Sequence, residues 1–489
     1  MSHRLISTSQ GTSQDTLTLA ECQCSSNLTI NHLPDEVLLE IFDSFKVLID
    51  SGYWCTKFLH FILTHVCRRW RTIIFASTSR LGLHITVGPG RPRHLRTILS
   101  GPLPIFIGYN VKDFTVTKSS LWRLRSALKK HDRVRGISFK GSSAWFDEFF
   151  SATNCTFPLL ESIVLHSRYG QDIPETFLGG PDLSNLHLQC LNLHNFSFKS
   201  ISRLLLSAST LIDLDLEISA SERITLPETS LPACLQGMPL LCRLNLRIPS
   251  STPLEYLSSP LPPQTTLKDS IVPLTKLTLF HYSGDIELLD AIVAGLSAPA
   301  LESANMKLGG TSLSPIVHVP RFIDEIKEHR RTAKVSFGWI CSLSLSQPSW
   351  LQFECTPEPE GYPESIMQMS GALSPKLISV EELHIFLSIE AIEHGISWHK
   401  FYQHFPNVKV IRTKNTAPSG LAGTLLQDLE KHVDDLTCFP ALEEIEVGHY
   451  QLRWHESRSE SELAVFDPFI SARQRIGRPV KVYAGPVLG

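Results

Sequence analysis

The sequence lacks the features that would place the chain in a membrane or in the secretory pathway. No stretch reaches the roughly 18 consecutive apolar residues that a membrane-spanning helix requires. The N-terminus has no apolar core of the kind that secretory signals carry. The 11 cysteines are odd in number, scattered and without a Cys-x-x-Cys pair, which is typical of reduced thiols rather than of a disulfide framework or a zinc site. We therefore expect an intracellular protein with no membrane contact.

Sequence motifs for catalysis and for nucleic-acid binding are also missing. Lys plus Arg number 45 and Asp plus Glu 48, so the net charge of -3 argues against binding by phosphate neutralisation. There is no phosphate loop, no Gly-x-Ser-x-Gly and no His-Glu-x-x-His. The spacing of five between His394, His399 and His404 does not align them on one helix face, as metal ligands would need. We expect no catalytic residue, no cofactor and no metal.

Leucine is abundant and unevenly spread. Eighteen leucines fall among the 64 positions from Leu183 to Leu246, against 17 in the 181 positions from Gly309 onward. The pattern apolar-x-x-apolar-x-apolar recurs along the chain, and successive starts among the first seven matches differ by 26, 28, 23, 30, 33 and 27 in sequence number. The matches start at Val134, Leu160, Leu188, Leu211, Leu241, Leu274, Leu301, Val380 and Leu442, with a partial match at Val408.

This period and pattern are typical of leucine-rich repeats. The last two apolar residues of each match share one face of a short strand, because they are two positions apart. Each repeat is then a strand with a return helix or coil, and it buries its apolar face only by stacking on its neighbours. Helical returns are expected at residues 200–208 and 286–293, and the long gap from Leu301 to Val380 is near three repeats. A generic β-rich domain is the plainer alternative.

The remaining strand residues should point to the concave face, which a solenoid uses, together with its loops, to grip a macromolecule. Two Pro/Ser-rich stretches, residues 249–266 and 356–375, are expected to be loops inserted in it. Each concave residue taken singly has the alternative of being an ordinary solvated side chain. The candidates for binding a protein substrate are His166, His194, Glu217, Arg247, Phe280 and Lys307, with His384 and Glu446 farther along.

Residues 30–76 have a different, helical character. Leu33-Pro34-Asp35-Glu36 is typical of a helix start, with proline in the first turn and two acids near the positive helix end. Apolar residues follow at helical spacing from Val37 to Phe45, and again from Leu59 to Ile74. About 45 residues bury too little surface for a stable domain, so we expect an exposed apolar face that takes a partner.

These residues resemble an F-box. The family pattern is Leu-Pro-x-Glu-apolar, an Ile/Phe pair, then Val-Cys-basic-x-Trp, and both halves occur here in order ahead of the repeats, as Leu33-Pro34-Asp35-Glu36-Val37, Ile41-Phe42 and Val66-Cys67-Arg68-Arg69-Trp70. Residues 43–57 are longer and more polar than a compact F-box has, and we interpret them as a loop insertion. Short segments over nearly the whole chain, including residues 80–85, 101–107 and 174–180, resemble the large F-box families of mushroom-forming fungi.

The resemblance implies a fungal cytoplasmic or nuclear protein that works as an adaptor. F-box proteins bind the Skp adaptor through the helical module, and that complex hangs from a cullin, which brings the charged ubiquitin-conjugating enzyme. The repeat domain then selects a protein substrate. Carried over by position, the adaptor contacts would be Leu33, Pro34, Val37, Leu38, Ile41, Phe42, Val66, Cys67 and Trp70; of these, Ile41 and Trp70 have the alternative of packing only within the module.

The predictions combine into an α+β chain with four parts: a disordered Ser/Thr-rich leader over residues 1–29, the F-box over 30–76, a connecting segment over 77–110 and an irregular α/β leucine-rich-repeat solenoid over 111–489. The expected function is non-catalytic substrate recognition in a Skp–cullin–F-box ubiquitin ligase. One alternative is an interaction or scaffold protein that does not direct ubiquitination. Another is an enzyme with its own active site, which only the chain length favours.

Overall fold

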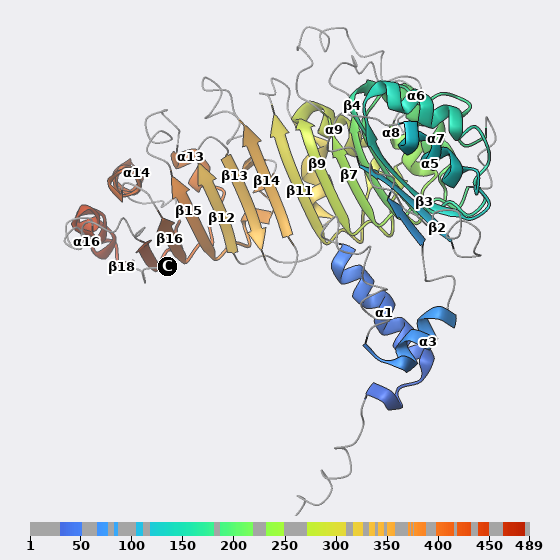
Figure 1. Ribbon diagram of the computed structural model, residues 1–489. Coiled ribbons are helices and arrows are strands. Elements are labelled where there is room, and N and C mark those ends of the chain that lie inside the picture. The colour runs from blue at the N-terminus through green and yellow to red at the C-terminus, as the bar shows by residue number, and fades with distance from the viewer. Residues whose placement is uncertain are drawn as a thin grey trace, which may run out of the picture. The chain divides into compact units, whose positions relative to one another are not determined.

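The fold is known from a computed structural model, in which the chain divides into two compact units, Met1–His84 and Ile85–Gly489 (Figure 1). The leader expected at residues 1–29 lies outside the described residues. So do residues 249–266 and most of the second expected loop. The structure describes residues 30–50, 66–76, 83–86, 104–110, 118–179, 186–218, 231–248, 271–309, 316–325, 332–337, 341–346, 350–356, 370–371, 373–374, 376–387, 398–414, 418–431, 439–448 and 463–484.

Two helices form the described part of the first unit. Leu38 and Phe42, one turn apart on the first helix, are buried. The Phe42 ring packs against the Trp70 ring of the second helix with 4.7 Å between ring centroids, and Ile73 and Ile74 are buried on the same helix. The helical prediction is therefore confirmed for this stretch. The elements are a 3-10 turn at Ile30–His32, α1 (Asp35–Asp50) and α3 (Arg68–Ala76).

The interpretation of residues 43–57 as a loop insertion is wrong for their first half, because α1 continues to Asp50. The physical reason is visible in the sequence: no glycine or proline interrupts the stretch from Asp35 to Asp50, and the first helix-ending residue is Gly52. Residues 51–65 lie outside the described part of the chain.

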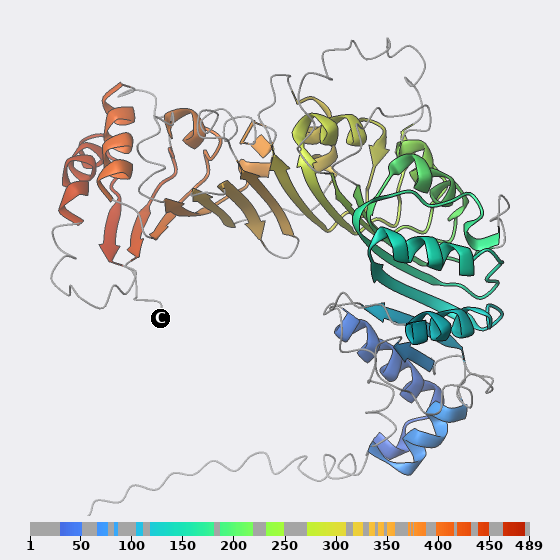
Figure 2. The ribbon, with the colours of Figure 1, turned by 45° about the horizontal axis from the view of Figure 1, so that its top comes forward.

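The second unit is built on one large sheet with helices, an α/β architecture of the leucine-rich-repeat-like kind (Figures 1 and 2). Among the described residues sixteen strands form it, in the order β1-β2-β3-β4-β5-β6-β7-β9-β11-β14-β13-β12-β15-β16-β17-β18. Two of these strands come from the segment expected to be a connection. The strands of the first half are β1 (Leu83–Thr86), β2 (Ile105–Asn110), β3 (Val134–Gly141), β4 (Ser162–Gln171), β5 (Cys190–Phe196), β6 (Asp213–Ile218), β7 (Arg243–Arg247), β9 (Leu279–Asp285) and β11 (Ser303–Gly309).

Leucines stack in register through the centre of this sheet. Leu191, Leu214 and Leu244 are paired across adjacent parallel strands, and each is at most 1% exposed. The second apolar residue of each strand, such as Leu216, forms a parallel buried row. One face of every repeat is therefore buried against its neighbours, as the spacing predicts.

The predicted frame is shifted by three residues at β9. The pattern made Leu277 and Leu279 the two buried strand residues, but Phe280 and Tyr282 take those positions; Leu277 is buried ahead of the strand, and Leu279 is 42% exposed. Phe280 is in register with Leu244 and packs on Phe322 of α10 (His318–Asp324), with 5.2 Å between ring centroids. Because both pairs read apolar-x-apolar, the sequence pattern fits either register, and a shift by an odd number of residues exchanges the two faces.

Return helices lie along one face of the sheet (Figure 2). Both helical returns expected from the sequence, at residues 200–208 and 286–293, are confirmed as α7 and α9. The described helices of the second unit are α5 (Lys118–Leu128), α6 (Ser143–Ala152), α7 (Phe198–Ser207), α8 (Leu231–Gln236), α9 (Ile286–Ala294), α10 (His318–Asp324), α13 (Trp398–Tyr402), α14 (Pro418–Lys431) and α16 (Asp467–Arg475), with 3-10 turns at Phe177–Gly179 and Ala464–Phe466 and a two-strand pair of β8 (Val272–Pro273) and β10 (Leu296–Ser297).

The long gap between Leu301 and Val380 does not hold three ordinary repeats. After α10 the chain forms β12 (Thr332–Phe337), β13 (Cys341–Ser346) and β14 (Trp350–Thr356), which pair antiparallel with one another. The reason is loop length: only three residues separate successive strands, and parallel neighbours need a crossover of a dozen or more. Because β14 pairs with β11 and β12 with β15, both in parallel, the sheet continues through β15 (Glu382–Leu387), β16 (Val410–Lys414), β17 (Glu444–Gly448) and β18 (Lys481–Ala484).

Candidate functional site

The two halves of the F-box-like pattern meet through a hydrogen-bonded clamp. Arg69 of α3 reaches across to the start of α1, where its Nη2 donates to Asp35 Oδ1 at 2.6 Å and to the Leu33 carbonyl oxygen at 2.5 Å. Its Nε donates to the same Asp35 oxygen at 3.2 Å. The basic residue of one half and the Leu-Pro-Asp start of the other are therefore joined.

Cys67 has a local structural role at the start of α3. Its carbonyl oxygen accepts the first helical hydrogen bond, from Arg71 N, at 3.1 Å, and its Sγ accepts from Trp70 N at 3.4 Å. This is the position and the pairing of a helix N-cap, which supplies an acceptor to an N–H group that has no partner within the helix. Capping therefore accounts for a small polarisable side chain at this position.

The predicted adaptor contacts fall into exposed and buried groups. Leu38 and Phe42 are buried, so their side chains hold the module together rather than face solvent. The Ile41 side chain is 40% exposed, so part of its surface is open to solvent. Trp70 is half-buried against Phe42. Pro34, Val37, Ile41 and Val66 are exposed, while Leu33 and Cys67 are half-buried.

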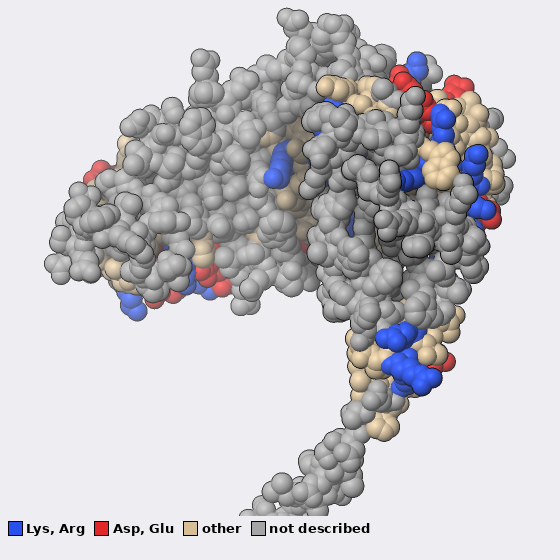
Figure 3. Space-filling view, viewed as in Figure 1, with Lys and Arg blue, Asp and Glu red and all other residues tan. Residues whose placement is uncertain are grey.

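The same module also exposes basic side chains. Figure 3 shows a blue cluster of Lys and Arg side chains on the described surface of the first unit. The arginines there are Arg68, Arg69 and Arg71, of which Arg68 and Arg71 are exposed. Exposed apolar side chains together with exposed positive charge are a composition that protein-binding surfaces have.

The second unit brings together five of the six residues predicted to bind a substrate. His166, His194, Glu217 and Arg247 are in register on the adjacent strands β4 to β7, and the same row continues through Ser283 to Lys307. They lie on the face of the sheet away from the packed core. We call this row, with the row of Asn192, Asp215 and Asn245 beside it, the inner face.

Phe280 is the exception, and its selection was wrong. The side chain is 2% exposed and belongs to the core, for the reason of register given above. In the inner-face row, β9 instead contributes His281 beside Asn245 and Ser283 beside Arg247.

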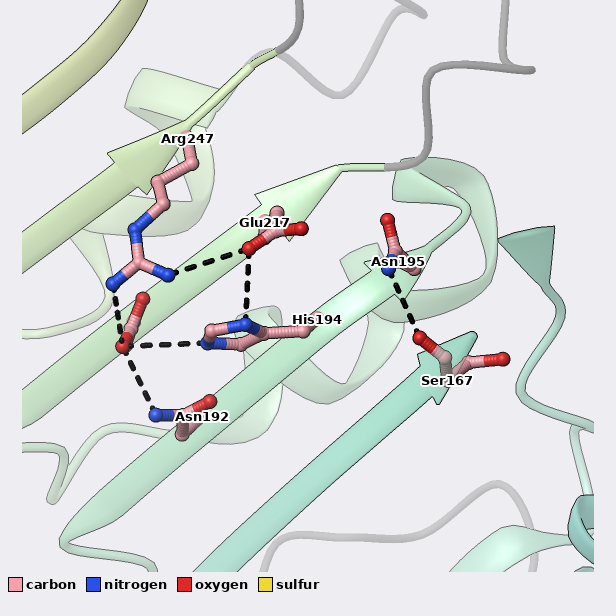
Figure 4. A network of polar contacts seen from close by, with 7 residues as sticks. Ser167, Asn192, His194, Asn195, Glu217 and Arg247 are labelled. Carbon is pink, nitrogen blue, oxygen red and sulfur yellow. Dashed lines mark hydrogen bonds and ion pairs between the residues drawn. The ribbon is translucent and has the colours of Figure 1, made fainter. Parts of the chain in front are cut away.

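A network of polar contacts ties the inner face together on β5 to β7 (Figure 4). His194 lies between two carboxylates, with Nδ1 3.0 Å from Glu217 Oε2 and Nε2 3.4 Å from Asp215 Oδ2. Asn192 Nδ2 donates to Asp215 Oδ2 at 2.9 Å. Arg247 approaches both acids from the next strand, with Nη1 3.3 Å from Glu217 Oε2 and Nη2 3.6 Å from Asp215 Oδ2.

Burial and neighbouring charges shift the titration of two members of this cluster. Burial, together with the charges of His194, Lys140 and Arg247, lowers the pKa of His166 to about 4. Burial by itself would raise the pKa of Asp215, but its contact with His194 and the charge of Arg247 hold that pKa below the ordinary value for Asp. Near neutral pH, His166 is therefore neutral and Asp215 ionised, with the His166 ring stacked on His194 at 3.9 Å between centroids.

A bulge frames one end of the cluster. The pairing of β4 with β5 jumps from His166 to Gln171, so the residues between them loop out of the ladder. Asn195 Nδ2 donates to the Ser167 carbonyl oxygen at 2.9 Å and holds the base of the bulge (Figure 4). Asn195 has a φ of 61°, a left-handed conformation that asparagine tolerates better than most residues. Tyr169, within the bulge, is 64% exposed.

A second charged cluster occupies the inner face near the C-terminal end of the sheet. Arg412 Nε donates to Glu382 Oε1 at 2.5 Å, its Nη1 donates to Glu446, and His384 Nε2 is 2.6 Å from Glu382. His384 and Glu446, noted from the sequence, are thus joined through this network. Each of these four side chains has a charged partner, so this cluster is closed on itself.

The sequence reasoning missed Asn192 and Asp215. The candidates were the residues that follow each apolar-x-apolar unit. The residue between the two apolar positions was passed over, although it points to the same face of the strand as the residue that follows the unit. That period of two was sufficient to find both.

Among the described residues, no group of three or more His, Cys, Asp or Glu side chains has an arrangement that would hold a metal ion. Within the same part of the chain, no helix has both the length and the apolar character needed to cross a membrane.

Comparison with known proteins does not place the chain in a family. No protein-family model matches the sequence, and no curated protein does. The crystal structure of the leucine-rich repeat-containing protein LegL7 from Legionella pneumophila aligns with 82% of this chain and 99% of its own, at 10% identity and a TM-score of 0.26. The repeat architecture described above rests on strand register and burial, not on this likeness.

Proposed function

We propose that this protein is the substrate-recognition subunit of a Skp–cullin–F-box ubiquitin ligase. One observation carries the proposal: α1 exposes Val37 and Ile41 one turn apart, while its neighbours Leu38 and Phe42 are committed to the module's interior. Exposed apolar residues at helical spacing on a module with so small a core are a surface for a partner. The resemblance to an F-box is the reason for proposing the Skp adaptor as that partner.

The two units have different roles in this proposal. The repeat unit offers the inner face, where side chains from adjacent strands form one polar surface for a protein substrate. In this proposal the chain positions its two partners: the first unit binds the adaptor, and the repeat unit binds the substrate. The catalytic step belongs to the conjugating enzyme that the cullin brings.

The adaptor test uses capture of purified Skp adaptor by the full-length chain. Changing Val37 and Ile41 together to Glu keeps helix-forming residues on α1 but puts charge in the apolar surface, and should abolish capture. Glu40→Gln, an exposed polar change on the same helix, is the matched control and should leave capture intact. Absence of capture by the wild type would refute the F-box assignment.

The alternative of a scaffold that does not direct ubiquitination is separated by a second experiment. A ligase reconstituted from the chain, the adaptor, the cullin with its RING subunit and the conjugating enzyme should modify a protein that the repeat unit binds. Adaptor capture without modification of any bound partner would favour the scaffold.

A further inference from the structure

The inner face contains oxygen acceptors that have no donor in the chain. Asp215 is only 8% exposed, and its Oδ1 has no hydrogen-bond partner. The Oδ1 atoms of Asn192 and Asn245, its register neighbours on either side, are unpartnered too. The orientation of Asn192 is fixed by the bond from its Nδ2 to Asp215, so its oxygen cannot turn away. Buried acceptors without donors are costly, so a donor from outside the chain would complete this row.

The charge of the cluster also favours a donor from outside the chain. Asp215 and Glu217 bring two negative charges, and Arg247 is the only permanent positive charge in contact with them among the described residues. Leaving the imidazoles aside, these two carboxylates therefore face a single guanidinium. A cationic donor would satisfy both the charge and the open acceptors.

Arg247 is the loosest member of the network. Its two contacts are 3.6 and 3.3 Å long, whereas a good charge-assisted hydrogen bond from nitrogen to oxygen is about 2.7–2.9 Å. The acids are positioned without it, by Asn192 at 2.9 Å and His194 at 3.0 Å. One third of the Arg247 side chain is exposed, so it can swing away and leave the acids in place.

We propose that the Asp215/Glu217 pair is the binding site for a basic side chain, arginine above all, of the protein substrate. The incoming guanidinium takes the place that Arg247 holds loosely and donates to both carboxylates and to the amide oxygens of Asn192 and Asn245. Arginine fits better than lysine because its planar fork presents five donors. This inference rests on the proposed role of the repeat unit in selecting a protein substrate, and it names the chemistry of that substrate.

The test measures binding of two fluorescent heptapeptides to the full-length chain by anisotropy at physiological ionic strength. One has the sequence Gly-Ser-Arg-Gly-Arg-Ser-Gly and the other has glutamate in place of both arginines. The arginine peptide should bind about tenfold tighter than the glutamate peptide, and Asp215→Asn should remove that preference. Asp213→Asn is the matched control, because Asp213 lies on the same strand and already pairs with Arg243 at 2.6 Å; it should leave the preference unchanged.

Arg247→Ala decides between the proposal and its opposite. If Arg247 occupies the place of the substrate's basic side chain, its removal leaves affinity for the arginine peptide unchanged or higher. If the inner face instead takes an acidic segment, the glutamate peptide binds better and Arg247→Ala weakens it, which overturns the proposal. Equal binding of both peptides by the wild type overturns it as well.

Folding and adaptor binding are checked separately. A thermal melt of each variant reports folding, and Glu217→Gln, at a less buried position, replaces Asp215→Asn if the latter fails to fold. Adaptor capture by the same preparations reports on the proposed function. Absence of arginine preference in a wild type that captures the adaptor would refute the inference alone, whereas absence of capture would refute the proposed function.

Discussion

His166 shows how one residue on the inner face links stability to pH. Its pKa in the folded protein is about 4, whereas an unfolded histidine has a pKa near 6.5. At a pH between these two pKa values, His166 is protonated in the unfolded chain and neutral in the folded chain. The free energy of unfolding therefore falls as the pH drops from about 6.5 to about 4, and this loss is complete below the folded value.

Replacing His166 with Phe should reduce that loss. Phenylalanine keeps an aromatic ring on His194 but cannot titrate, so unfolding by urea should depend less on pH between about 6.5 and 4 than in the wild type. The depressed pKa of Asp215 acts in a separate window, below the ordinary value of Asp. His187→Phe, at an exposed position, is the control; an identical pH dependence in wild type and His166→Phe would contradict the assignment.

At the scale of the element, α9 and α10 of successive repeats are joined by side chains that satisfy helix ends. Asp290 of α9 accepts hydrogen bonds from the first backbone N–H groups of α10, from His318 at 2.7 Å and Val319 at 2.8 Å. In the other direction Arg321 of α10 donates to carbonyl oxygens at the end of α9, including that of Val293 at 2.8 Å. Helix termini leave such groups without intrahelical partners, so the neighbouring repeat completes them.

Asp290→Ala should loosen α10. Loss of this cap is expected to cost about 0.5–2 kcal/mol locally, the usual range for a helix N-cap. Hydrogen exchange of the amides of residues 318–324 should accelerate, while exchange in α14 stays the same. Asp290→Asn keeps one acceptor and should have a smaller effect; equal exchange in α10 for wild type and Asp290→Ala would show that the contact is unimportant.

At the scale of the whole molecule, the repeat unit is a linear stack in which each strand pairs only with its neighbours. Strand pairing continues from β2 to β18 with local bulges, through parallel repeats, the antiparallel insert and parallel repeats again. The stability of such a stack is close to a sum of repeat and interface contributions. Damage in one repeat should therefore spread to the adjoining repeats and fade with distance.

Leu214→Ala tests this property. Leu214 is fully buried between Leu191 and Leu244, so its truncation should cost about 2–5 kcal/mol. Hydrogen exchange should accelerate in β5, β6 and β7 and remain unchanged in β16 and β17. Leu206→Ala, at a position 50% exposed on α7, is the control with an expected effect below about 0.5 kcal/mol; uniform acceleration over the whole sheet would contradict the linear stack.

The site was only partly readable from the sequence. The spacing of the leucines placed His166, His194, Glu217 and Arg247 on one face, and the structure puts them in one register row. The spacing could not predict that Phe280 is buried, because Leu277-x-Leu279 and Phe280-x-Tyr282 are equally apolar. Only the packing of Phe280 against Phe322 selects the second pair. Which side chains bond one another also stayed open, since the contacts are made between residues 21 to 32 positions apart.

The sequence by itself determined the helical start directly after Pro34, the repeating strand and the burial of one face, because these depend on periodicities of 3.6 and 2 within short stretches. Only the tertiary structure decided the antiparallel insert of β12 to β14 and the order in which Asn192, His194 and Arg247 surround two carboxylates. Those features arise from pairing between distant segments, and a local pattern contains no information about which segments meet.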